Sequence, residues 1–239
     1  MKNEGRGQGR SGDGSSSGAS SKNAPDVVLL HGLGRTWLSM PPVHAYLCHH
    51  GFRVANLGYP SRKFSVESLV ARRIGPRLEE LLSDRPLHFV THSMGGILLR
   101  RFLQDRDLPP GSRVVMLAPP NRGSELVDRL QRLALFRWWN GPAGLQLGAG
   151  PDSLPNRLGP IRAEVGVISG NRCLNPIFGR IIPGPSDGKV SVERARLPEM
   201  TDFLVLPVSH TFAMFRRPVL AQVLHFLRHG RFDRSSVGG

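Results

Sequence analysis

The stretch His88-Phe-Val-Thr-His-Ser-Met-Gly-Gly96 decides the fold of this chain of 239 residues. The apolar and β-branched residues 87–90 predict a short buried strand, and apolar residues resume with helical spacing over 97–103. A strand that passes into a helix through such a sequence is typical of a nucleophile elbow, a sharp turn that lifts a serine hydroxyl clear of the sheet. We therefore predict that Ser93 is a nucleophile.

The residues around Ser93 match such an elbow in part. Gly95 and Gly96 allow the helix to pack close to the strand. The glycine that usually stands two places before the nucleophile is replaced by Thr91, whose Cβ must fit a crowded position. Taken alone, this pattern is equally compatible with a serine in an ordinary glycine-rich turn, so the rest of the chain has to decide.

Strands and helices alternate over the remaining sequence. Strands are expected at 26–30, 52–57, 113–118, 165–169 and 203–206, and helices at 39–50, 65–83, 124–139 and 218–228. The helix 65–83 should be kinked at Gly75-Pro76, because proline has no backbone N–H to donate. The alternation predicts one α/β domain over residues 25–230, with about six mostly parallel strands flanked by helices.

Three segments stand apart from this alternation. Residues 1–24 are rich in glycine and serine with almost no apolar side chains, so we expect a disordered tail. Residues 231–239 are expected to form a C-terminal tail. The excursion 123–160 carries an amphipathic helix and a long irregular stretch, which predicts a small helical cap or lid near the sheet edge that carries Ser93. Four of its apolar residues would line an acyl site or pack as ordinary core: Leu133, Phe136, Trp138 and Trp139.

Two further loops are expected at the same sheet edge as Ser93. The carboxyl ends of parallel strands joined by right-handed crossovers lie along one edge. The loop 207–210 after the last strand carries His210, and the loop 185–190 between the last two strands carries Asp187. His210 would accept the proton of Ser93 as its hydroxyl attacks a carbonyl, and Asp187 would hold the imidazole tautomer. These three residues form the predicted catalytic triad.

Other side chains compete for these roles. The Ser-Asp-Gly sequence around Asp187 is also common in ordinary turns. Asp202 precedes the last strand and should lie at the opposite sheet edge, whereas Asp128 and Asp152 precede the penultimate strand, where a less common acid position exists. His92 is expected to pack beneath the elbow rather than to act as a base.

A tetrahedral intermediate also needs donors for its oxyanion. One predicted donor is the backbone N–H of Met94, the residue after the nucleophile. The other is the backbone N–H of Leu33, because Gly32 lets the loop after the first strand come close. This chemistry needs no cofactor. We expect no metal either, although four potential ligands gather in the first helix: His44, Cys48, His49 and His50.

Composition bears on partners and compartment. The net charge is +14, and only four of the 32 basic residues are lysines, with the arginines scattered along the chain. This charge would attract nucleic acid, anionic lipid or an acidic substrate, or the arginines only solvate helix faces. No aromatic-basic nucleic-acid motif is present, so we expect no nucleic-acid partner, while transient contact with a membrane surface stays open.

The cysteines and the apolar segments indicate a compartment. Cys48 and Cys173 make no disulfide framework, which is typical of a reducing environment. The sequence has neither a signal-like apolar region nor an uncharged apolar run of membrane-spanning length. If the sequence is complete at its start, we expect a soluble cytoplasmic protein; its oligomeric state is not indicated.

Four matches in order carry a family resemblance. They are VVLLHGLGRT at 27–36, HFVTHSMGG at 88–96, SDGKV at 186–190 and SHTF at 209–212. Together they resemble a bacterial lipase or carboxylesterase of the α/β-hydrolase superfamily over roughly residues 25–230, and more distantly the lipase-like deacylases of lipid anchors. The resemblance implies the α/β-hydrolase fold. It also implies roles for five residues: Ser93 as nucleophile, Asp187 as acid, His210 as base, and Leu33 and Met94 at the oxyanion hole.

We therefore predict a cofactor-independent serine hydrolase that cleaves carboxylic esters, an esterase or lipase acting through an acyl-enzyme on Ser93. The substrate would be a small-molecule ester or a lipid, but the fold supports many reactions and does not name it. One alternative is an acyl thioesterase, for which the basic surface would steer an anionic substrate. A noncatalytic binding module of the same fold is the other, and the complete triad argues against it.

Overall fold

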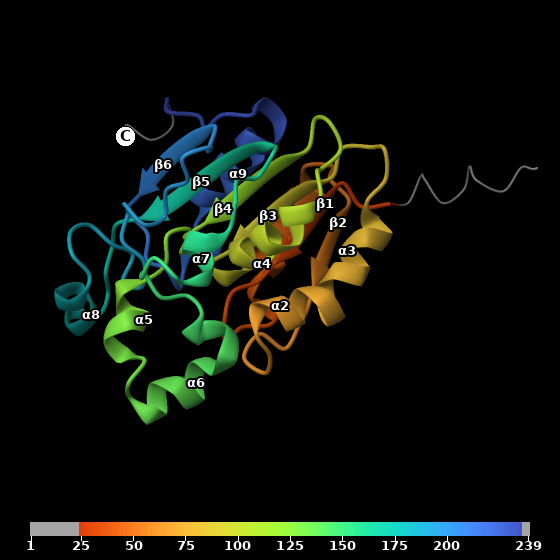
Figure 1. Cartoon of the computed structure of the whole chain (residues 1–239). Coiled ribbons are helices and arrows are strands. Elements are labelled where there is room, and N and C mark those ends of the chain that lie inside the picture. Colours follow the sequence, from red (N-terminus) through yellow and green to blue (C-terminus); the bar gives the residue numbers. More distant parts are fainter. Residues whose placement is uncertain (1–23, 236–239) are drawn as a thin grey trace, which may run out of the picture.

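The computed structural model describes residues 24–235, so all but the last residue of the expected N-terminal tail lies outside the described residues. Six parallel strands form one sheet in the order β2-β1-β3-β4-β5-β6 (Figure 1). The strands are β1 (Val27–Leu30), β2 (Val54–Leu57), β3 (His88–His92), β4 (Arg113–Leu117), β5 (Glu164–Gly170) and β6 (Asp202–Leu206). The predicted α/β class is confirmed, and all six expected strands are present.

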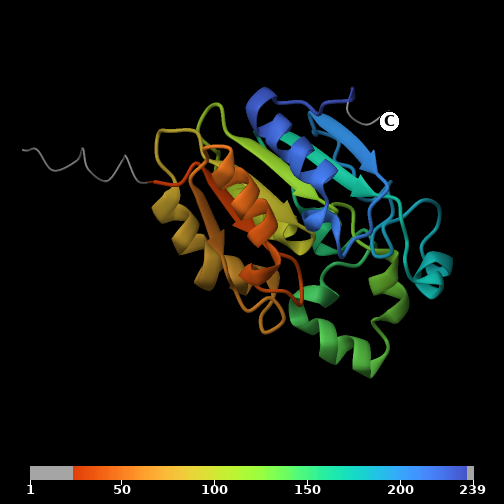
Figure 2. The same ribbon diagram turned by 180° about the vertical axis from the view of Figure 1, so that it is seen from behind.

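The central strands are apolar on both faces because helices cover both. The helices α2 (Val66–Leu69), α3 (Gly75–Leu81) and α4 (Met94–Phe102) lie over the face seen in Figure 1. The opposite face is covered by α1 (Pro41–His49) and α9 (Arg217–His229), as Figure 2 shows. Each layer has its own core of buried side chains, and all four residues of β1 are completely buried between them.

The register of the strands places the ends of β1, β3 and β4 at nearly the same level along the sheet. Leu30, the last residue of β1, pairs with Thr91 of β3, and His92 pairs with Leu117, the last residue of β4. The three loops that follow these strands therefore begin at nearly the same level. As a result, the residues after β1, β3 and β4 meet at one edge of the sheet.

The expected kink in the second helix is present as a distinct structure. A π-helical turn, η2 (Val70–Ile74), joins α2 to α3, and the amide of Gly75 donates to the carbonyl of Val70. A Cβ on Gly75 would lie 2.3 Å from that carbonyl oxygen, so only glycine fits there. Pro76 then follows in the first turn of α3, where its missing N–H has no helical partner to lose.

The helix expected at 124–139 is wrong in its bounds. Two helices occupy this region, α5 (Glu125–Leu130) and α6 (Ala134–Leu145), and Leu133 between them has an extended backbone. The apolar stripe read from the sequence is not continuous, because Leu126 is buried while Leu133 is exposed. Conversely α6 runs into the stretch expected to be irregular, and a positive φ of 64° at Gly141 bends it there.

Five short elements complete the described part of the chain. They are α7 (Leu154–Arg157), α8 (Pro176–Ile181), which the sequence did not indicate, and the 3-10 turns η1 (Trp37–Ser39), η3 (Leu103–Asp105) and η4 (Ala213–Phe215). Both α5 and α6 lie beyond the carboxyl ends of the strands, as does α8 (Figure 1). No helix in residues 24–235 is both long and apolar enough to cross a membrane.

The excursion is closed at its base. The amide of Ser124 donates to the carbonyl of Leu147 at 2.9 Å, and a Cβ on Gly123 would lie only 1.9 Å from the carbonyl oxygen of Gly148. Residues 125–147 therefore leave the sheet edge and return to the same point. This segment, within the range 123–160 expected to be a cap, is called the cap below.

Packing continues past Gly230, where we expected a tail to begin. Phe232 is buried against Phe226 of α9, and its amide donates to Asp202. Arg234 forms an ion pair with the same carboxylate, with 2.6 Å between Nη2 and Oδ1. The first residues of the expected tail thus close the amino end of β6.

Candidate active site

The turn after β3 holds Ser93 in a backbone conformation that residues with a Cβ seldom adopt. Its φ is 53° and its ψ is −123°, and its amide donates to the carbonyl of Leu117 at 2.9 Å. A Cβ at Gly95 would lie 2.5 Å from the carbonyl oxygen of Leu30, so glycine allows α4 to begin directly against β1. The predicted strand–turn–helix elbow is present.

Thr91, which stands where a glycine is usual, fits because the nearby Gly96 has no side chain. Thr91 is completely buried, and a Cβ on Gly96 would stand 3.2 Å from its Oγ1. This separation is tighter than an ordinary van der Waals contact. Gly96 therefore provides the space that the usual glycine at the position of Thr91 would have provided, and the turn keeps its shape.

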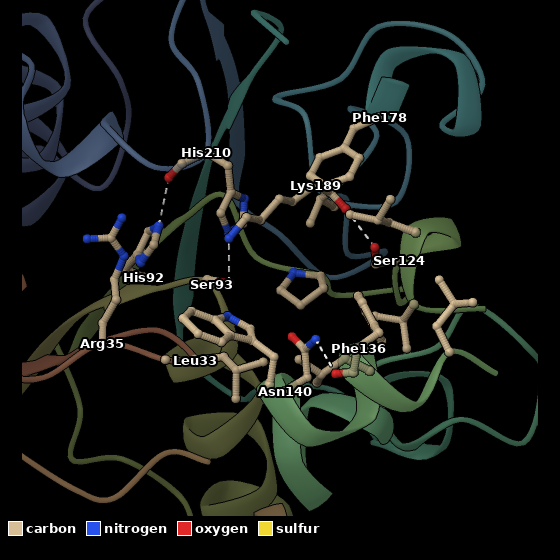
Figure 3. A pocket seen from close by; sticks show the side chains of 18 of the residues that line it. Leu33, Arg35, His92, Ser93, Ser124, Phe136, Asn140, Phe178, Lys189 and His210 are labelled. Atoms are coloured by element: carbon tan, nitrogen blue, oxygen red, sulfur yellow. Dashed lines mark hydrogen bonds between the residues drawn. The ribbon is translucent and has the colours of Figure 1, made fainter. Parts of the chain in front are cut away.

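The three residues of the predicted triad are brought together in a line. His210 Nε2 lies 2.9 Å from Ser93 Oγ, and its Nδ1 lies 2.8 Å from Asp187 Oδ2 (Figure 3 shows the first contact). The exposed fractions are 8% for Ser93, 5% for His210 and 2% for Asp187. Both distances are those of hydrogen bonds, so a proton can pass from the hydroxyl to the imidazole.

Backbone groups orient Asp187. Its Oδ1 accepts from the amides of Lys189 and Val190 at 2.9 and 2.8 Å, which leaves Oδ2 for the imidazole. The amide of His210 also donates to the carbonyl of Asp187 at 3.0 Å. Asp187 is thus a turn aspartate and the partner of His210 at once, so the two interpretations of the sequence are compatible.

The rival acids lie elsewhere. Asp202 begins β6 at the opposite sheet edge, as expected, and pairs with Arg234. Asp128 lies in the cap and accepts a hydrogen bond from the amide of Ala149, and Asp152 is exposed. No contact with His210 is present for any of them within residues 24–235.

The side chain of His92 contacts the backbone of His210. Its Nε2 lies 3.0 Å from the carbonyl oxygen of His210, and the ring is buried. Burial holds the pKa of His92 well below its usual range, and the nearby His210 lowers that pKa further. A neutral ring must therefore donate from Nε2, which fixes the backbone that carries the catalytic imidazole.

The side chains that we weighed as metal ligands do not form a cluster of three. Cys48 Sγ lies 3.9 Å from the ring nitrogens of His44, and His49 lies edge-on to His50. Within residues 24–235, no group of three or more His, Cys, Asp or Glu side chains is placed to hold a metal ion.

The loop after β1 packs directly against Ser93. A Cβ on Gly32 would lie 3.1 Å from Ser93 Cβ and 2.8 Å from His92 Nδ1, so only glycine permits this approach. Buried His31 holds the loop in place. Its ring stacks on that of Tyr59 with 3.9 Å between the centroids, and the Tyr59 hydroxyl donates to the backbone carbonyl of His31. Within the described residues, the amides of Leu33 and Met94 donate to no acceptor, so both are available to an oxyanion.

A cavity of about 630 Å³ opens beside Ser93 and His210. The four cap residues singled out in the sequence all line it; Figure 3 labels one of them, Phe136. Leu133, Trp138 and Trp139 have exposed fractions of 56%, 73% and 58%. These three are therefore wall and rim of the cavity rather than core, whereas Phe136 is partly buried and also packs against the core.

Several other cavity residues were not singled out from the sequence. Arg35 and Lys189 supply charge, Asn140 supplies an amide, and Phe178 of α8 supplies an aromatic wall. Each cation stands within three residues of a predicted site residue, Leu33 or Asp187. That proximity was a usable signal, but both were read as part of the scattered basic surface.

Three enclosed histidines predict a pH dependence of stability. Burial is the largest cause that lowers the pKa of His31, His88 and His92 below the usual value of about 6.5. As pH falls below about 6.5, the unfolded chain binds protons that the folded chain does not, so the free energy of unfolding should decrease. We expect Tm to fall between about pH 6.5 and pH 5, above the range in which carboxylates titrate.

The variant His92→Gln provides the control, because the glutamine amide can still donate to the carbonyl of His210. It removes one titrating ring, so the slope of Tm against pH should be shallower than in the parent protein. A slope equal to that of the parent would contradict a neutral His92 in the folded state.

Comparisons with known proteins agree with the fold. A family model described as the alpha/beta hydrolase family matches residues 27–234. No curated protein shows significant sequence similarity to the chain.

Solved structures share the fold at low sequence identity. The mature Bacillus licheniformis lipase BlEst2 superposes with a TM-score of 0.62 at 21% identity, over 85% of this chain and 89% of that one. The Legionella pneumophila phospholipase PlaB superposes with a TM-score of 0.61 at 18% identity, over 88% of this chain but only 61% of its own length. A thermophilic esterase from Thermogutta terrifontis superposes with a TM-score of 0.53 at 13% identity, over 85% of this chain and 89% of that one.

Proposed function

The chain belongs to the alpha/beta hydrolase family, and within that family we propose that it is a serine hydrolase of carboxylic esters, an esterase or lipase without a cofactor. One observation carries the proposal. A continuous hydrogen-bonded line from Asp187 through His210 to Ser93 ends at a cavity whose walls are mostly apolar. An activated hydroxyl at the mouth of an apolar cavity suits a carbonyl attached to an acyl chain.

The reaction follows from the positions of the donors and acceptors. Ser93 Oγ attacks the ester carbonyl while His210 Nε2 takes its proton, and the carbonyl oxygen becomes an oxyanion near the amides of Leu33 and Met94. His210 then gives this proton to the leaving alcohol, and an acyl-enzyme on Ser93 is formed. Water, deprotonated by the same imidazole, releases the acid and restores the hydroxyl.

The names of the structural neighbours are in keeping with this proposal. A lipase, a phospholipase and an esterase share the fold, although their low identity supports the architecture rather than the substrate. The substrate we propose is accordingly a small-molecule ester or a lipid.

A substrate profile tests the proposal. The purified chain should hydrolyse p-nitrophenyl esters, and kcat/KM should change with acyl length as the chain fills the cavity. Acyl-CoA of the same lengths serves as the comparison for the thioesterase alternative. Preferred hydrolysis of acyl-CoA would replace the ester assignment, and no hydrolysis of either series would favour the noncatalytic binding module.

The cap should determine selectivity for long acyl chains. We expect Trp138→Ala and Trp139→Ala to lower kcat/KM more for long esters than for short ones, because these side chains form the exposed cavity wall. Each methylene buried on the wall contributes about 0.8 kcal/mol, so a difference of four carbons can change kcat/KM by about two hundredfold. The measurement is kcat/KM over a series of p-nitrophenyl esters.

Trp37→Ala is the matched control for these two variants. Trp37 is half exposed on η1 and does not line the cavity, yet the chemical change is the same. It should leave the dependence on acyl length unaltered. Equal losses on short and long esters in Trp138→Ala and Trp139→Ala would exclude a role of the cap in acyl binding.

A further inference from the structure

Two cations line the same cavity as the candidate triad. Arg35 follows the loop that packs on Ser93, and its guanidinium donates to the carbonyl of Thr211, the residue after His210, at 3.0 Å. Lys189 lies two residues after Asp187, and its backbone amide donates to that carboxylate. Both cations are therefore tied to the candidate site, and in Figure 3 the side chain of Lys189 extends toward His210 while that of Arg35 lies beside His92.

Neither cation forms an ion pair within the described residues, although the carboxylate of Asp187 lies within electrostatic range of Lys189 and raises its pKa. Among the described residues that line the cavity, none is an aspartate or a glutamate. The oxygens of Asp187 are occupied by His210 and by two backbone amides. Within residues 24–235, Arg35 and Lys189 form no ion pair, and the ammonium group of Lys189 makes no hydrogen bond.

The two positive charges are close enough to repel each other. Burial lowers the pKa of Arg35. Lys189 is solvent-exposed as a residue, yet desolvation by the surrounding protein is still the largest cause that lowers the pKa of its ammonium group. The positive charge of Arg35 lowers the pKa of Lys189 further, so the two cations lie within electrostatic range of each other. An anion placed between or beside them would relieve this repulsion and would accept charge-assisted hydrogen bonds.

We propose that Arg35 and Lys189 form an anion subsite, and that the preferred substrate is an acyl ester of a small alcohol that carries a phosphate group. This inference rests on the proposed function, because it places the acyl chain on the cap and the alcohol at the cations. Two cations match the double negative charge of a phosphate monoester better than the single charge of a carboxylate.

The location of the cations restricts the distance between the phosphate and the scissile bond. Both cations belong to loops that carry or contact the triad, so we place the phosphate within a few bonds of the ester oxygen. A glycerol phosphate headgroup meets this condition. In acyl-CoA the long pantetheine arm separates the phosphates from the thioester, which would place them outside the cavity.

The test compares two substrates that differ only in the phosphate. We expect kcat/KM for 1-decanoylglycerol 3-phosphate to exceed that for 1-decanoylglycerol at least about tenfold, both below their micellar concentrations, as for one charge-assisted hydrogen bond. Arg35→Gln and Lys189→Gln should each lower this ratio about tenfold or more. Arg35→Lys and Lys189→Arg, which keep the charge, should retain most of the preference.

Arg137→Gln is the matched control. Arg137 is exposed on α6 and does not line the cavity, so it changes the net charge equally without touching the subsite. Its substrate ratio should equal that of the parent protein. An equal fall in Arg137→Gln would mean long-range attraction by the basic surface, and an equal loss on both substrates in Arg35→Gln would mean a general role in structure or catalysis. Either result would overturn the subsite.

Binding without turnover separates this inference from the proposed function. Calorimetry on Ser93→Ala should show that octyl phosphate binds at least about tenfold more tightly than 1-O-octylglycerol, and that Lys189→Gln removes the difference. Equal binding of the two would overturn the subsite whether or not any ester is hydrolysed. If inorganic phosphate alone binds as tightly as octyl phosphate, the subsite takes free phosphate and the substrate assignment is wrong. Binding as expected but no hydrolysis would instead reject the proposed function.

Discussion

Ser93→Ala should lower kcat for ester hydrolysis by about 10⁴-fold or more while leaving the fold intact. Nucleophile and base act as a unit, so removing the hydroxyl leaves only the contributions of the oxyanion donors and of substrate binding. Stability should change little, because the one hydrogen bond of Ser93 Oγ to another of the described residues is that with His210 at the cavity. The measurement is kcat on the best p-nitrophenyl ester, together with Tm.

Covalent labelling gives an independent answer. A fluorophosphonate should modify Ser93 in the parent protein and no residue in Ser93→Ala, as seen by mass spectrometry of the peptides. Labelling of another serine, or full activity of the alanine variant, would reject Ser93 as the nucleophile.

The second large effect concerns the acid. Asp187→Asn should lower kcat about 10³- to 10⁴-fold, because an amide can present its N–H₂ to His210 Nδ1 and favour the tautomer that cannot accept the serine proton. The amide oxygen can still accept from the amides of Lys189 and Val190, so the turn should persist. Circular dichroism and Tm would show whether it does.

Asp202→Asn and Asp152→Asn are the controls for this assignment. Asp202 lies at the opposite sheet edge, so its substitution should lower Tm through the lost Arg234 contact and leave kcat near that of the parent. Asp152 is exposed and contacts no triad member. A loss of kcat in Asp152→Asn as large as in Asp187→Asn would move the acid to the earlier loop.

The parts of the molecule that the sequence predicted are those governed by local pattern and by topology. The alternation of apolar strands and amphipathic helices leads to a parallel sheet, and a parallel sheet brings the loops after β3, β5 and β6 to one edge. Ser93, Asp187 and His210 could therefore be expected to meet before any distance was known. Glycines beside a crowded turn, such as Gly32 and Gly95, carried the same information about close approach.

The cap was less predictable because its conformation depends on contacts distant in sequence. The cation–π contact of Arg62 with Trp139 and the hydrogen bond from Val66 to Gln146 hold α6 against residues that precede the elbow. A periodic pattern cannot report such contacts, so one helix was expected where two occur. That Arg35 and Lys189 form no ion pair among the described residues is likewise a property of the assembled cavity, and the charge of the sequence gives no sign of it.

The pair Thr91 and Gly96 has a consequence for recognising such elbows from sequence. The space at this turn limits the combined side-chain volume of positions 91 and 96. Here Thr91 takes that space and Gly96 leaves it free. A search pattern that demands glycine two places before the serine passes over this chain, although its turn has the same shape. A pattern that asks for glycine at either position, and leaves the other free, would include this chain.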